Sequence, residues 1–579
     1  MESANIRRPF LKLLPVQVAT IVIGSINALV DTVFTSRFLG ESAVAGVGFF
    51  SPMLTIILLC AVVLNGTQIL CGQAVGKGKS GDVTSLFSTA FVTLAGYGLF
   101  LALIGFFLRA PLSALLGARD EAAAYLRDYL AGFMPGVPLL MLGEQMMMFL
   151  PCNNEIKKSY WVMGVMMGSN ALLDYLAICV LHWGTLGLGI ATALSYLISS
   201  LISLPCFLRK DKAYRIDLRT VRMGWMKEAI HLGLPDVAFN LGITLRSYLM
   251  NLSVMSLIGT AGVAALNVQN ILLSFMGAVP QGNAGAFTIL GSIYYGEKDR
   301  ASLKKLTGLS LKTGVGISCV LTAALIIFSP LIASFFFPAG TEANLLTQQM
   351  LVFFSSVFIW NSVFVILTRC FQIQNYLKQV NLLNFIEQVL TAAVAAVGIR
   401  LIGVTAVWLS TPVADILCLL LILLWLRIGL RRMPSTLEEW IRLPEDFGVR
   451  DEDVLEFKVS SMEDVTMTSA RIMDFCQRKG IDARRTFITG LAVEEMAGNV
   501  IAYGQQGGKQ HHIEIRIAAA EELIIRIRDD CRAFDPTQRI NQFSPEDPAK
   551  NVGIRMIGKL AAEMNYHNDA GINTLLIRI

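Results

Sequence analysis

Five polar side chains in the first 200 residues interrupt long apolar stretches, at positions where they could bind a proton or a small cation. They are Asp31, Tyr129, Asn170, Asp174 and Thr192. Asn170 and Asp174 are four residues apart and therefore share one face of a helix. At a rise of about 1.5 Å per residue, all but Asn170 lie about 10 Å below the same membrane surface.

Asp31 and Asp174 are the two acids of this set. Two carboxylates in one low-dielectric site cannot both stay ionised unless a cation joins them. Ionisable residues inside membrane spans are costly and usually functional. The set therefore predicts a site that couples a process to protons or sodium ions. The competing interpretation is that each acid is a helix-end cap or a satisfied packing residue.

The elements that must position these residues are membrane-spanning helices. Hydrophobic residues make up 54% of the 579-residue chain, charged residues only 16%, and the mean hydropathy is +0.58. Such a composition excludes an ordinary soluble protein and indicates a polytopic membrane protein. We predict twelve spans: 15–38, 44–74, 83–108, 122–149, 159–182, 186–208, 228–257, 262–294, 303–330, 345–371, 379–400 and 404–428.

Basic residues gather in alternate loops between these spans. Lys77, Lys157 and Arg215 belong to loops on one side, whereas few basic residues belong to the other side. The bias predicts that both termini lie in the cytosol and that the protein is a multi-pass protein of the inner (plasma) membrane. The net charge of +5 is small and forms no basic stripe, so no nucleic-acid partner is expected. The ten cysteines are scattered singly, which argues against a disulfide framework or a zinc site.

The two halves of the membrane part repeat. A displacement of 219 residues places Val44 on Val263 and Pro111 on Pro330. Six helices followed by six in the same orientation predict two bundles with a cavity between them, which is a transporter architecture. The expected organisation is a cytosolic N-terminal segment 1–14, bundles 15–208 and 228–428 with a cytosolic loop 209–227 between them, a linker 429–449 and a C-terminal domain 450–579.

Several motifs of the membrane part resemble the multidrug and toxic compound extrusion (MATE) family. They are Asn27–Asp31, Gly40–Ala45, Pro151–Lys157 and Gly187–Thr192, together with Asn170 and Asp174. The resemblance covers about residues 10–430. It implies an efflux antiporter that exports small organic molecules across the lipid bilayer in exchange for protons or sodium. It also implies that the five polar residues named first form the cation site of the N-terminal bundle.

The second bundle departs from another branch of that family, which has a glutamate after Gly233-Leu234-Pro235. Here the same helix offers Asp236, Asn240 and Arg246 as cavity residues, so coupling through this bundle is not expected. Arg246 needs an anionic ligand or a carboxylate partner, and Asp236 and Glu387 are both candidates. If Arg246 lines the cavity, a strictly cationic substrate is disfavoured.

The C-terminal part changes to the periodicities of a soluble domain. We predict strands at 454–459, 513–517, 523–527 and 574–579, and helices from about 462 to 479, 482 to 503 and 554 to 564. The chain should therefore be an all-α membrane protein of twelve helices in two six-helix bundles, followed by a two-layer α+β domain with helices on one face of an antiparallel or mixed sheet.

Three patches in this domain could bind a nucleotide. Glu495 and Asn499 share a helix face, where the amide oxygen could bind magnesium and the carboxylate could act as a base. Asp529 follows a strand and could accept a hydrogen bond from an adenine amino group. The Asn551-Val552-Gly553-Ile554 segment opens a helix, where backbone N–H groups could meet phosphate.

In this order the patches resemble the histidine-kinase-type ATPase fold, most closely its anti-sigma-factor serine kinase branch. The resemblance implies ATP and magnesium as cofactors, Glu495 as catalytic base, Asn499 as magnesium ligand, Asp529 and Gly553 as nucleotide contacts, and Thr574 as helper of Asp529. It also implies an anti-anti-sigma-like protein partner. Cys531 and Asn551 stand where the pattern has glycine, and the phosphoacceptor histidine box of a sensor kinase is missing.

Three functions remain open at this point. The first is a MATE-like antiporter with a regulatory ATP-binding domain, which occurs once, lacks a P-loop and is not expected to power transport. The second is a membrane-anchored serine kinase or anti-sigma switch whose helices act as sensor. The third is a lipid-linked flippase that uses the cationic cavity around Arg246. The antiporter requires Asp174, whereas the kinase requires Glu495 and Asn499.

Overall fold

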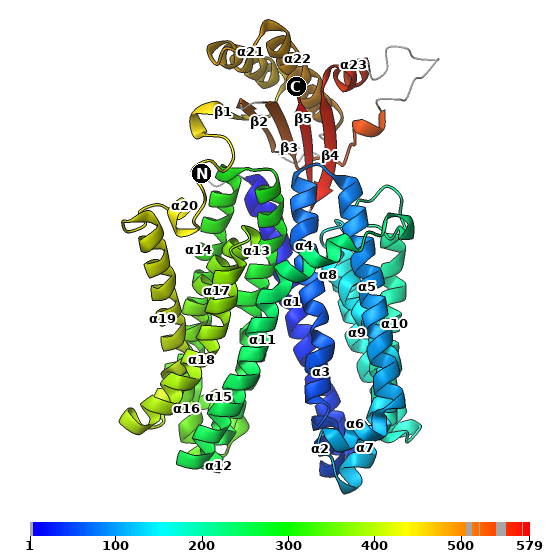
Figure 1. The fold of residues 1–579 in the computed structure, drawn as a ribbon, viewed down its shortest axis with the longest axis vertical. Coiled ribbons are helices and arrows are strands. Elements are labelled where there is room, and N and C mark those ends of the chain that lie inside the picture. The colour runs from blue at the N-terminus through cyan, green and yellow to red at the C-terminus, as the bar shows by residue number, and fades with distance from the viewer. Residues whose placement is uncertain (1–3, 505–511, 520–521, 540–551, 570) are drawn as a thin grey trace.

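The structure is a computed structural model, shown in Figure 1, that describes residues 4–504, 512–519, 522–539, 552–569 and 571–579. Two helical bundles stand side by side, and the C-terminal domain lies across one end of them. We call this end of the bundles the domain side. Asn551, expected at the start of a phosphate-contacting helix, lies outside the described residues.

The first bundle is formed by helices whose apolar side chains face lipid and each other. They are α1 (Ala4–Phe34), continued by a π-helix (Thr35–Leu39), α2 (Glu41–Gly48), α3 (Ser51–Leu58), α4 (Cys60–Gly76), α5 (Ser80–Phe107), α6 (Arg109–Leu115), α7 (Asp120–Phe133), α8 (Val137–Phe149), α9 (Ile156–Tyr175), continued by a π-helix (Leu176–Val180), and α10 (Gly184–Phe207).

The second bundle repeats this plan. It consists of α11 (Gly224–Leu257), α12 (Thr260–Met276), α13 (Ala278–Gly296), α14 (Arg300–Ile327), α15 (Ser329–Phe336), α16 (Glu342–Phe354), α17 (Val357–Ile373), α18 (Leu377–Ile402) and α19 (Thr405–Leu430).

The structure confirms the predicted all-α membrane part. Among the described residues, nine helices are long and apolar enough to span a membrane, or ten if α16 and α17, bent by 44°, are one span. Two more stretches carry charged residues within them. One is α7 followed by α8, which includes Glu144, and the other is α11, which includes Asp236 and Arg246. Together they give the twelve predicted crossings.

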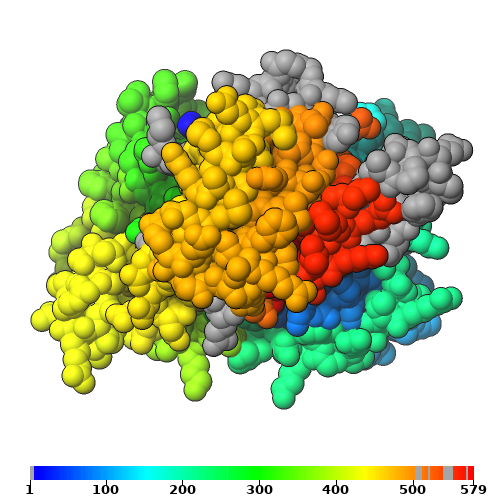
Figure 2. Space-filling model, turned by 90° about the horizontal axis from the view of Figure 1, so that it is seen from above, coloured from blue at the N-terminus to red at the C-terminus, as the bar shows by residue number. Residues whose placement is uncertain are grey.

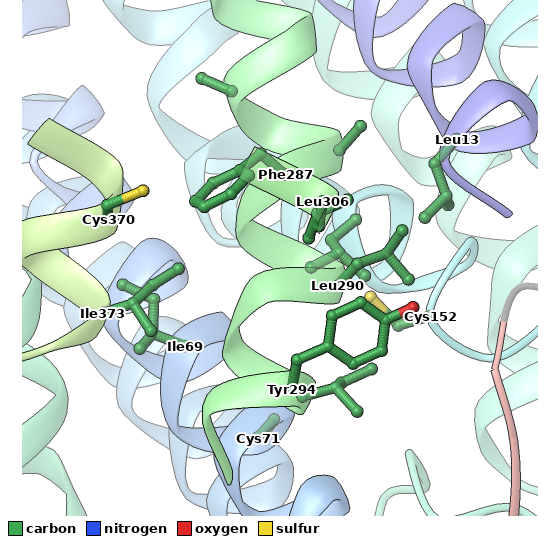
Figure 3. Packing of buried hydrophobic residues seen from close by; sticks show 14 of the residues in the cluster. Leu13, Ile69, Cys71, Cys152, Phe287, Leu290, Tyr294, Leu306, Cys370 and Ile373 are labelled. Carbon is green, nitrogen blue, oxygen red and sulfur yellow. The ribbon is translucent and has the colours of Figure 1, made fainter. Parts of the chain in front are cut away.

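The two bundles touch on the domain side and diverge toward the opposite end (Figure 1). Glycines permit the contact, because a Cβ atom at Gly66 or Gly76 would overlap the backbone of Ala229 or Ile293 in the other bundle. Figure 3 shows the packing around this contact, with Cys71 of α4 below Tyr294 of α13, and Ile69 of α4 beside Ile373 of α17. The domain side is therefore closed by close helix packing.

The C-terminal domain is a five-stranded sheet with helices on one face. Its strands are β1 (Val454–Val459), β2 (Ile513–Ala519), β3 (Leu523–Asp529), β4 (Glu563–Asp569) and β5 (Ile572–Arg578), and its helices are α21 (Met462–Arg478), α22 (Ala483–Asn499) and α23 (Val552–Leu560). All pairs are antiparallel, in the order β1-β2-β3-β5-β4. Every second strand residue, such as Ile515, Ile525 and Ile577, packs under the helices.

One predicted element of this domain was wrong. The helix expected over residues 554–564 ends at Leu560, and Glu563–Asp569 forms strand β4, which the sequence patterns did not show. The strand forms because it pairs with β5 along its whole length, from Glu563 opposite Arg578 to Asp569 opposite Ile572. Tertiary pairing here overrides the helix-forming alanines that follow Leu560.

A short linker joins the two parts. Helix α20 (Leu437–Trp440) begins with a capping box formed by Thr436 and Glu439. Glu438 forms ion pairs with Arg300 at 3.0 Å and Lys304 at 2.9 Å on α14. Although partial burial opposes it, these two cations lower the pKa of Glu438. The linker is thus fastened to the second bundle.

Candidate functional site

The carboxyl groups of Asp31 on α1 and Asp174 on α9 face each other within the first bundle. Asp174 is fully buried. No described N–H or O–H group donates a hydrogen bond to either of its oxygens, nor to Oδ1 of Asp31. The structure thus brings these two carboxyls together, and among the described residues no lysine or arginine forms an ion pair with either of them.

The remaining members of the predicted set surround this pair to different degrees. Tyr129 on α7 is buried, lies in electrostatic range of both carboxyls, and stacks on Phe133 at 5.4 Å between ring centroids. Asn170 is buried one turn before Asp174, and its Oδ1 has no hydrogen-bond donor among the described residues. Thr192 is turned to its own helix, where its hydroxyl donates to the Leu188 carbonyl at 3.2 Å.

The second-bundle candidates do not form one group. Asp236 pairs with Arg369 at 3.2 Å. Asn240 donates to the backbone carbonyl of Asp236 at 2.7 Å, a bond within its own helix. No described carboxylate lies within 4.0 Å of the Arg246 guanidinium. Of the two partners that the sequence left open, Asp236 is therefore taken by Arg369.

Arg246 instead lies in electrostatic range of two acids on neighbouring helices, Glu387 on α18 and Asp415 on α19. Glu387 is 2% exposed and Asp415 is fully buried. Asn361 faces Asp415, but neither oxygen of Asp415 accepts a well-formed hydrogen bond from a described residue. One fixed cation and two buried acids thus share this part of the second bundle.

Sequence reasoning missed Asp415 and Glu144. The Glu144 carboxylate accepts a hydrogen bond from the Tyr196 hydroxyl at 3.0 Å in the first bundle. Both residues interrupt apolar stretches, as Asp31 does. The rule that selected Asp31, an acid inside a predicted span, would have found both.

In the C-terminal domain, Asp529 lies at the end of β3 on the helix-bearing side of the sheet. Its Oδ1 accepts hydrogen bonds from Asn573 Nδ2 at 2.7 Å and from the Cys531 backbone N–H at 3.0 Å. Burial raises the pKa of Asp529, and these two donors partly oppose the rise. Cys531, which replaces a glycine of the family pattern, thus still supplies the backbone N–H that holds this carboxylate.

Thr574 lies on the other face of the sheet from Asp529. The register of β3 and β5 pairs Asp529 with Asn573 and Arg528 with Thr574. Since side chains alternate along a strand, Thr574 points with Arg528 toward the helical bundles. The side chain that helps to hold Asp529 is Asn573, one residue before the predicted Thr574.

The Glu495 carboxylate packs against Gly553 near the start of α23, where any Cβ atom would overlap it. Asn499 is the last residue of α22, one turn after Glu495, and is partly exposed. A carboxylate held at a strand end, a glycine that a side chain would block, and a Glu–Asn pair on one helix face suit a magnesium nucleotide. The residues present therefore fit the nucleotide that this fold implies.

The sequence did not predict a buried ionic cluster between the C-terminal domain and the second bundle. The cluster joins Glu297 and Asp299, in the turn between α13 and α14, to three strand arginines, Arg516, Arg526 and Arg528. Arg526 lies 3.1 Å from Glu297, and its side chain is 5% exposed. Burial alone would raise the pKa of Asp299, but the three arginines hold it well below its usual value.

Comparison with known families matches both parts of the chain. The MatE family model matches residues 15–176 and 235–397, which is more than half of the chain. The model of the histidine kinase-like ATPase domain matches residues 459–579. The C-terminal domain is therefore a histidine kinase-like ATPase domain.

Individual proteins agree with these matches. The probable multidrug resistance protein YoeA of Bacillus subtilis is 27% identical over 328 residues, which are 54% of this chain and 70% of that protein. The FAD transporter of Shewanella oneidensis is 26% identical over 53% of this chain and 70% of that protein. A multidrug resistance MATE family transporter of the MOP superfamily, solved in an outward-facing conformation, is 18% identical with a TM-score of 0.66, over 74% of this chain and 98% of its own. This last likeness shows the fold.

Proposed function

Because the chain belongs to the MatE family of multidrug efflux transporters, we propose that it is a secondary active antiporter that exports small organic molecules in exchange for protons or sodium ions. The single observation that supports this proposal is the facing pair of Asp31 and Asp174. Two facing carboxyls, Asp174 fully buried and Asp31 partly buried, must hold either a proton or a mobile cation when no fixed cation pairs with them.

In this proposal the pair takes up its cation in the state in which the domain side is closed. The bundles diverge away from the C-terminal domain (Figure 1), and in this proposal a cation reaches the pair from that end. Uptake of a proton or sodium ion would lower the negative charge of the pair and reduce the repulsion between α1 and α9. Closure of the open end and opening of the domain side would then release the cation on the other side of the membrane.

We place the domain side in the cytosol and the protein in the inner membrane. The basic loop residues support this orientation, because Lys77, Lys157 and Arg215 follow or precede helix ends on the domain side. The ATPase-like domain is joined to the same side.

We further propose that the C-terminal domain binds ATP with magnesium. Asp529, held by Asn573, would recognise the adenine amino group, Asn499 would bind the magnesium of the phosphates near Gly553, and Glu495 would act as the base. The bound nucleotide would supply a phosphoryl group or simply a ligand that orders the domain. The domain regulates transport in this proposal and does not drive it.

The test is substrate flux in proteoliposomes under an imposed proton gradient and, separately, a sodium gradient. Asp174→Asn should lower gradient-driven flux by about tenfold or more, because only one of the two carboxyls that take up the cation remains. Asp128→Asn, an exposed acid next to Tyr129 on α7, is the matched control and should leave flux unchanged. Equal flux in wild type and Asp174→Asn would refute the coupling site.

Arg246 favours a second proposal about the substrate. A guanidinium without a close carboxylate can bind an anionic group of a substrate, as a lipid-linked flippase would require. The FAD transporter among the relatives also carries an anionic molecule by its name. Competition of anionic and cationic compounds for flux in wild type and Arg246→Lys separates the substrate classes. Loss of inhibition by anions alone in the variant supports this proposal.

The kinase proposal requires the other site. Phosphate transfer from ATP to an added anti-anti-sigma-like protein, by the full-length protein, should vanish in Glu495→Ala. Flux that persists in Glu495→Ala while transfer is lost would show that the two activities are separate. Retained transfer in this variant would refute Glu495 as the base.

A further inference from the structure

The C-terminal domain contacts the two bundles in chemically different ways. Figure 2 shows the domain from above, lying over both of them. Its contact with the second bundle is the buried ionic cluster around Glu297 and Asp299, and the linker adds the ion pairs of Glu438. Opposite charges buried together are costly to separate, because each would be left without its partner. The domain is thus firmly attached to the second bundle.

The contact with the first bundle combines neutral amides, one ion pair and a long hydrogen bond of 3.4 Å from Asn5 Nδ2 on α1 to Glu514 Oε2 on β2. Asn154, in the turn between α8 and α9, donates from Nδ2 to Asn568 Oδ1 on β4 at 2.6 Å. Gly78, after α4, lies so close to Asn565 that a Cβ atom there would overlap the amide. An ion pair joins Arg8 of α1 to Asp530, and the Arg8 side chain is 44% exposed. Hydrogen bonds between neutral groups and exposed ion pairs are weak in water, so this contact is the one that can open.

The Asn154–Asn568 bond belongs to a continuous chain of hydrogen bonds that ends at the nucleotide-recognition residue. Asn568 Nδ2 donates to Asn573 Oδ1 at 2.6 Å, and Asn573 Nδ2 donates to Asp529 Oδ1 at 2.7 Å. The Tyr566 hydroxyl also donates to Asn573 Oδ1, at 2.7 Å. All three amides donate toward Asp529, and Asn568 and Asn573 each accept from the neighbour on the side of the first bundle.

Such a one-directional chain is cooperative. A carboxylate polarises the amide that donates to it, which makes the oxygen of that amide a better acceptor for the next donor. A ligand that donates a hydrogen bond to Asp529 competes with Asn573 for the negative charge of this carboxylate. The Asn573–Asp529 bond then weakens, and the weakening passes through Asn568 to Asn154.

We propose that the C-terminal domain is a nucleotide-controlled latch, in which a base amino group bound at Asp529 weakens the Asn568–Asn154 contact and releases the first bundle on the domain side. This inference rests on the proposed nucleotide site and on the proposed alternation between two open states. Opening of the domain side must separate α4 from α13, and the domain cannot then hold both bundles. The domain stays with the second bundle, and the latch breaks at Asn154.

The experiment measures the distance between fluorescent labels on the full-length protein in lipid nanodiscs. Labels on non-natural side chains replace Lys157 and Lys378, two exposed residues near the domain-side ends of the first and second bundles. The magnesium complex of a non-hydrolysable ATP analogue is added, and its binding is measured by calorimetry on the same sample. Wild type should shift toward the separated state by about five- to fiftyfold.

Asn154→Ala and Asn568→Ala should populate the separated state without nucleotide and respond to it less than twofold. The double variant should equal Asn568→Ala alone, because the bond that Asn154→Ala removes is already absent in Asn568→Ala. Gln477→Ala, which removes an exposed amide on α21, is the matched control and should behave as wild type. Two variants on opposite sides of the contact guard against a folding defect in one of them.

The outcomes separate this inference from the proposed function. Nucleotide that binds without moving the labels, or that moves them equally in wild type and both alanine variants, overturns the latch and leaves the nucleotide site standing. Failure of the analogue to bind wild type overturns both the latch and the nucleotide site. Neither result bears on the proposal that flux is coupled through Asp174.

Discussion

The two bundles follow the same plan but carry opposite charges at related places. The first helix of the first bundle bears Asp31, whereas the first helix of the second bundle bears Arg246. The turn after the second crossing holds Lys77 in the first bundle and Glu297 in the second. The difference teaches how a repeated fold divides its tasks. The first bundle keeps an acid pair that forms no ion pair with a described lysine or arginine, and the second bundle holds a cation near its buried acids and supplies ionic partners to the C-terminal domain.

The largest effect is expected when the charges of the two turn residues, Glu297 and Lys77, are reversed. Glu297→Lys places a fourth cation against buried arginines, so the C-terminal domain should leave the second bundle at a cost of about 3–5 kcal/mol. Hydrogen exchange should show faster exchange in β2 and β3. Lys77→Glu changes an exposed residue and should leave exchange unchanged. Unchanged protection in Glu297→Lys would contradict the role of the cluster.

A second test removes the fixed cation of the second bundle. Arg246→Met leaves Glu387 and Asp415 buried without a cation, so stability should fall by about 3 kcal/mol. Thermal unfolding in detergent, followed by fluorescence, measures the change. Arg246→Lys keeps the charge and should retain most of the stability. An Arg246→Met protein as stable as wild type would show that the two acids are neutral without it.

A third test removes a charge from the first bundle, where we do not expect the free energy of unfolding to fall. Asp174→Asn removes one of two facing carboxyls, so the free energy of unfolding should stay constant or rise by about 1 kcal/mol. The same thermal unfolding assay applies. Destabilisation as large as that expected for Arg246→Met would mean that Asp174 has a fixed partner.

The smallest effect concerns pH. The pKa of Asp299 is depressed in the folded chain, so its ion pairs contribute stability above its unfolded pKa, about 3.9. That contribution is lost only as the pH falls below about 3.9 toward the lower folded value. Docking of the C-terminal domain should therefore not change between about pH 5 and pH 8. Hydrogen exchange of β3 across this range checks the expectation, and a loss of protection near neutral pH would contradict it.

The features that could be predicted from the sequence depend only on one residue or one helix and the medium around it. Apolar runs predicted the crossings because lipid acts on each helix separately, and Asp31 and Asp174 were found because an acid is costly in any span. Thr574 was chosen in place of Asn573 because that choice depends on strand register, which local sequence does not determine. Strand β4 was missed for the same reason, since its partner β5 decides its conformation.

The arginines of the docking face show a different limit. Arg526 and Arg528 alternate with Ile525 and Ile527, and such alternation is typical of a strand with one face in water. The residues that bury them, Glu297 and Asp299, lie more than two hundred positions earlier and in another domain. Nothing near the arginines in sequence indicates this partner. Only the comparison of the two repeats, in which Lys77 of the first bundle corresponds to Glu297 of the second, points to this partner.

The short linker with helix α20 has a consequence for the strength that the latch needs. A tether that holds a domain next to its target replaces a search through solution by a high effective concentration, in the millimolar range for short linkers. A contact too weak to assemble two separate proteins can then remain formed most of the time. If the latch operates as proposed, the response of each molecule is also independent of how many copies the cell contains, because each copy carries its own C-terminal domain.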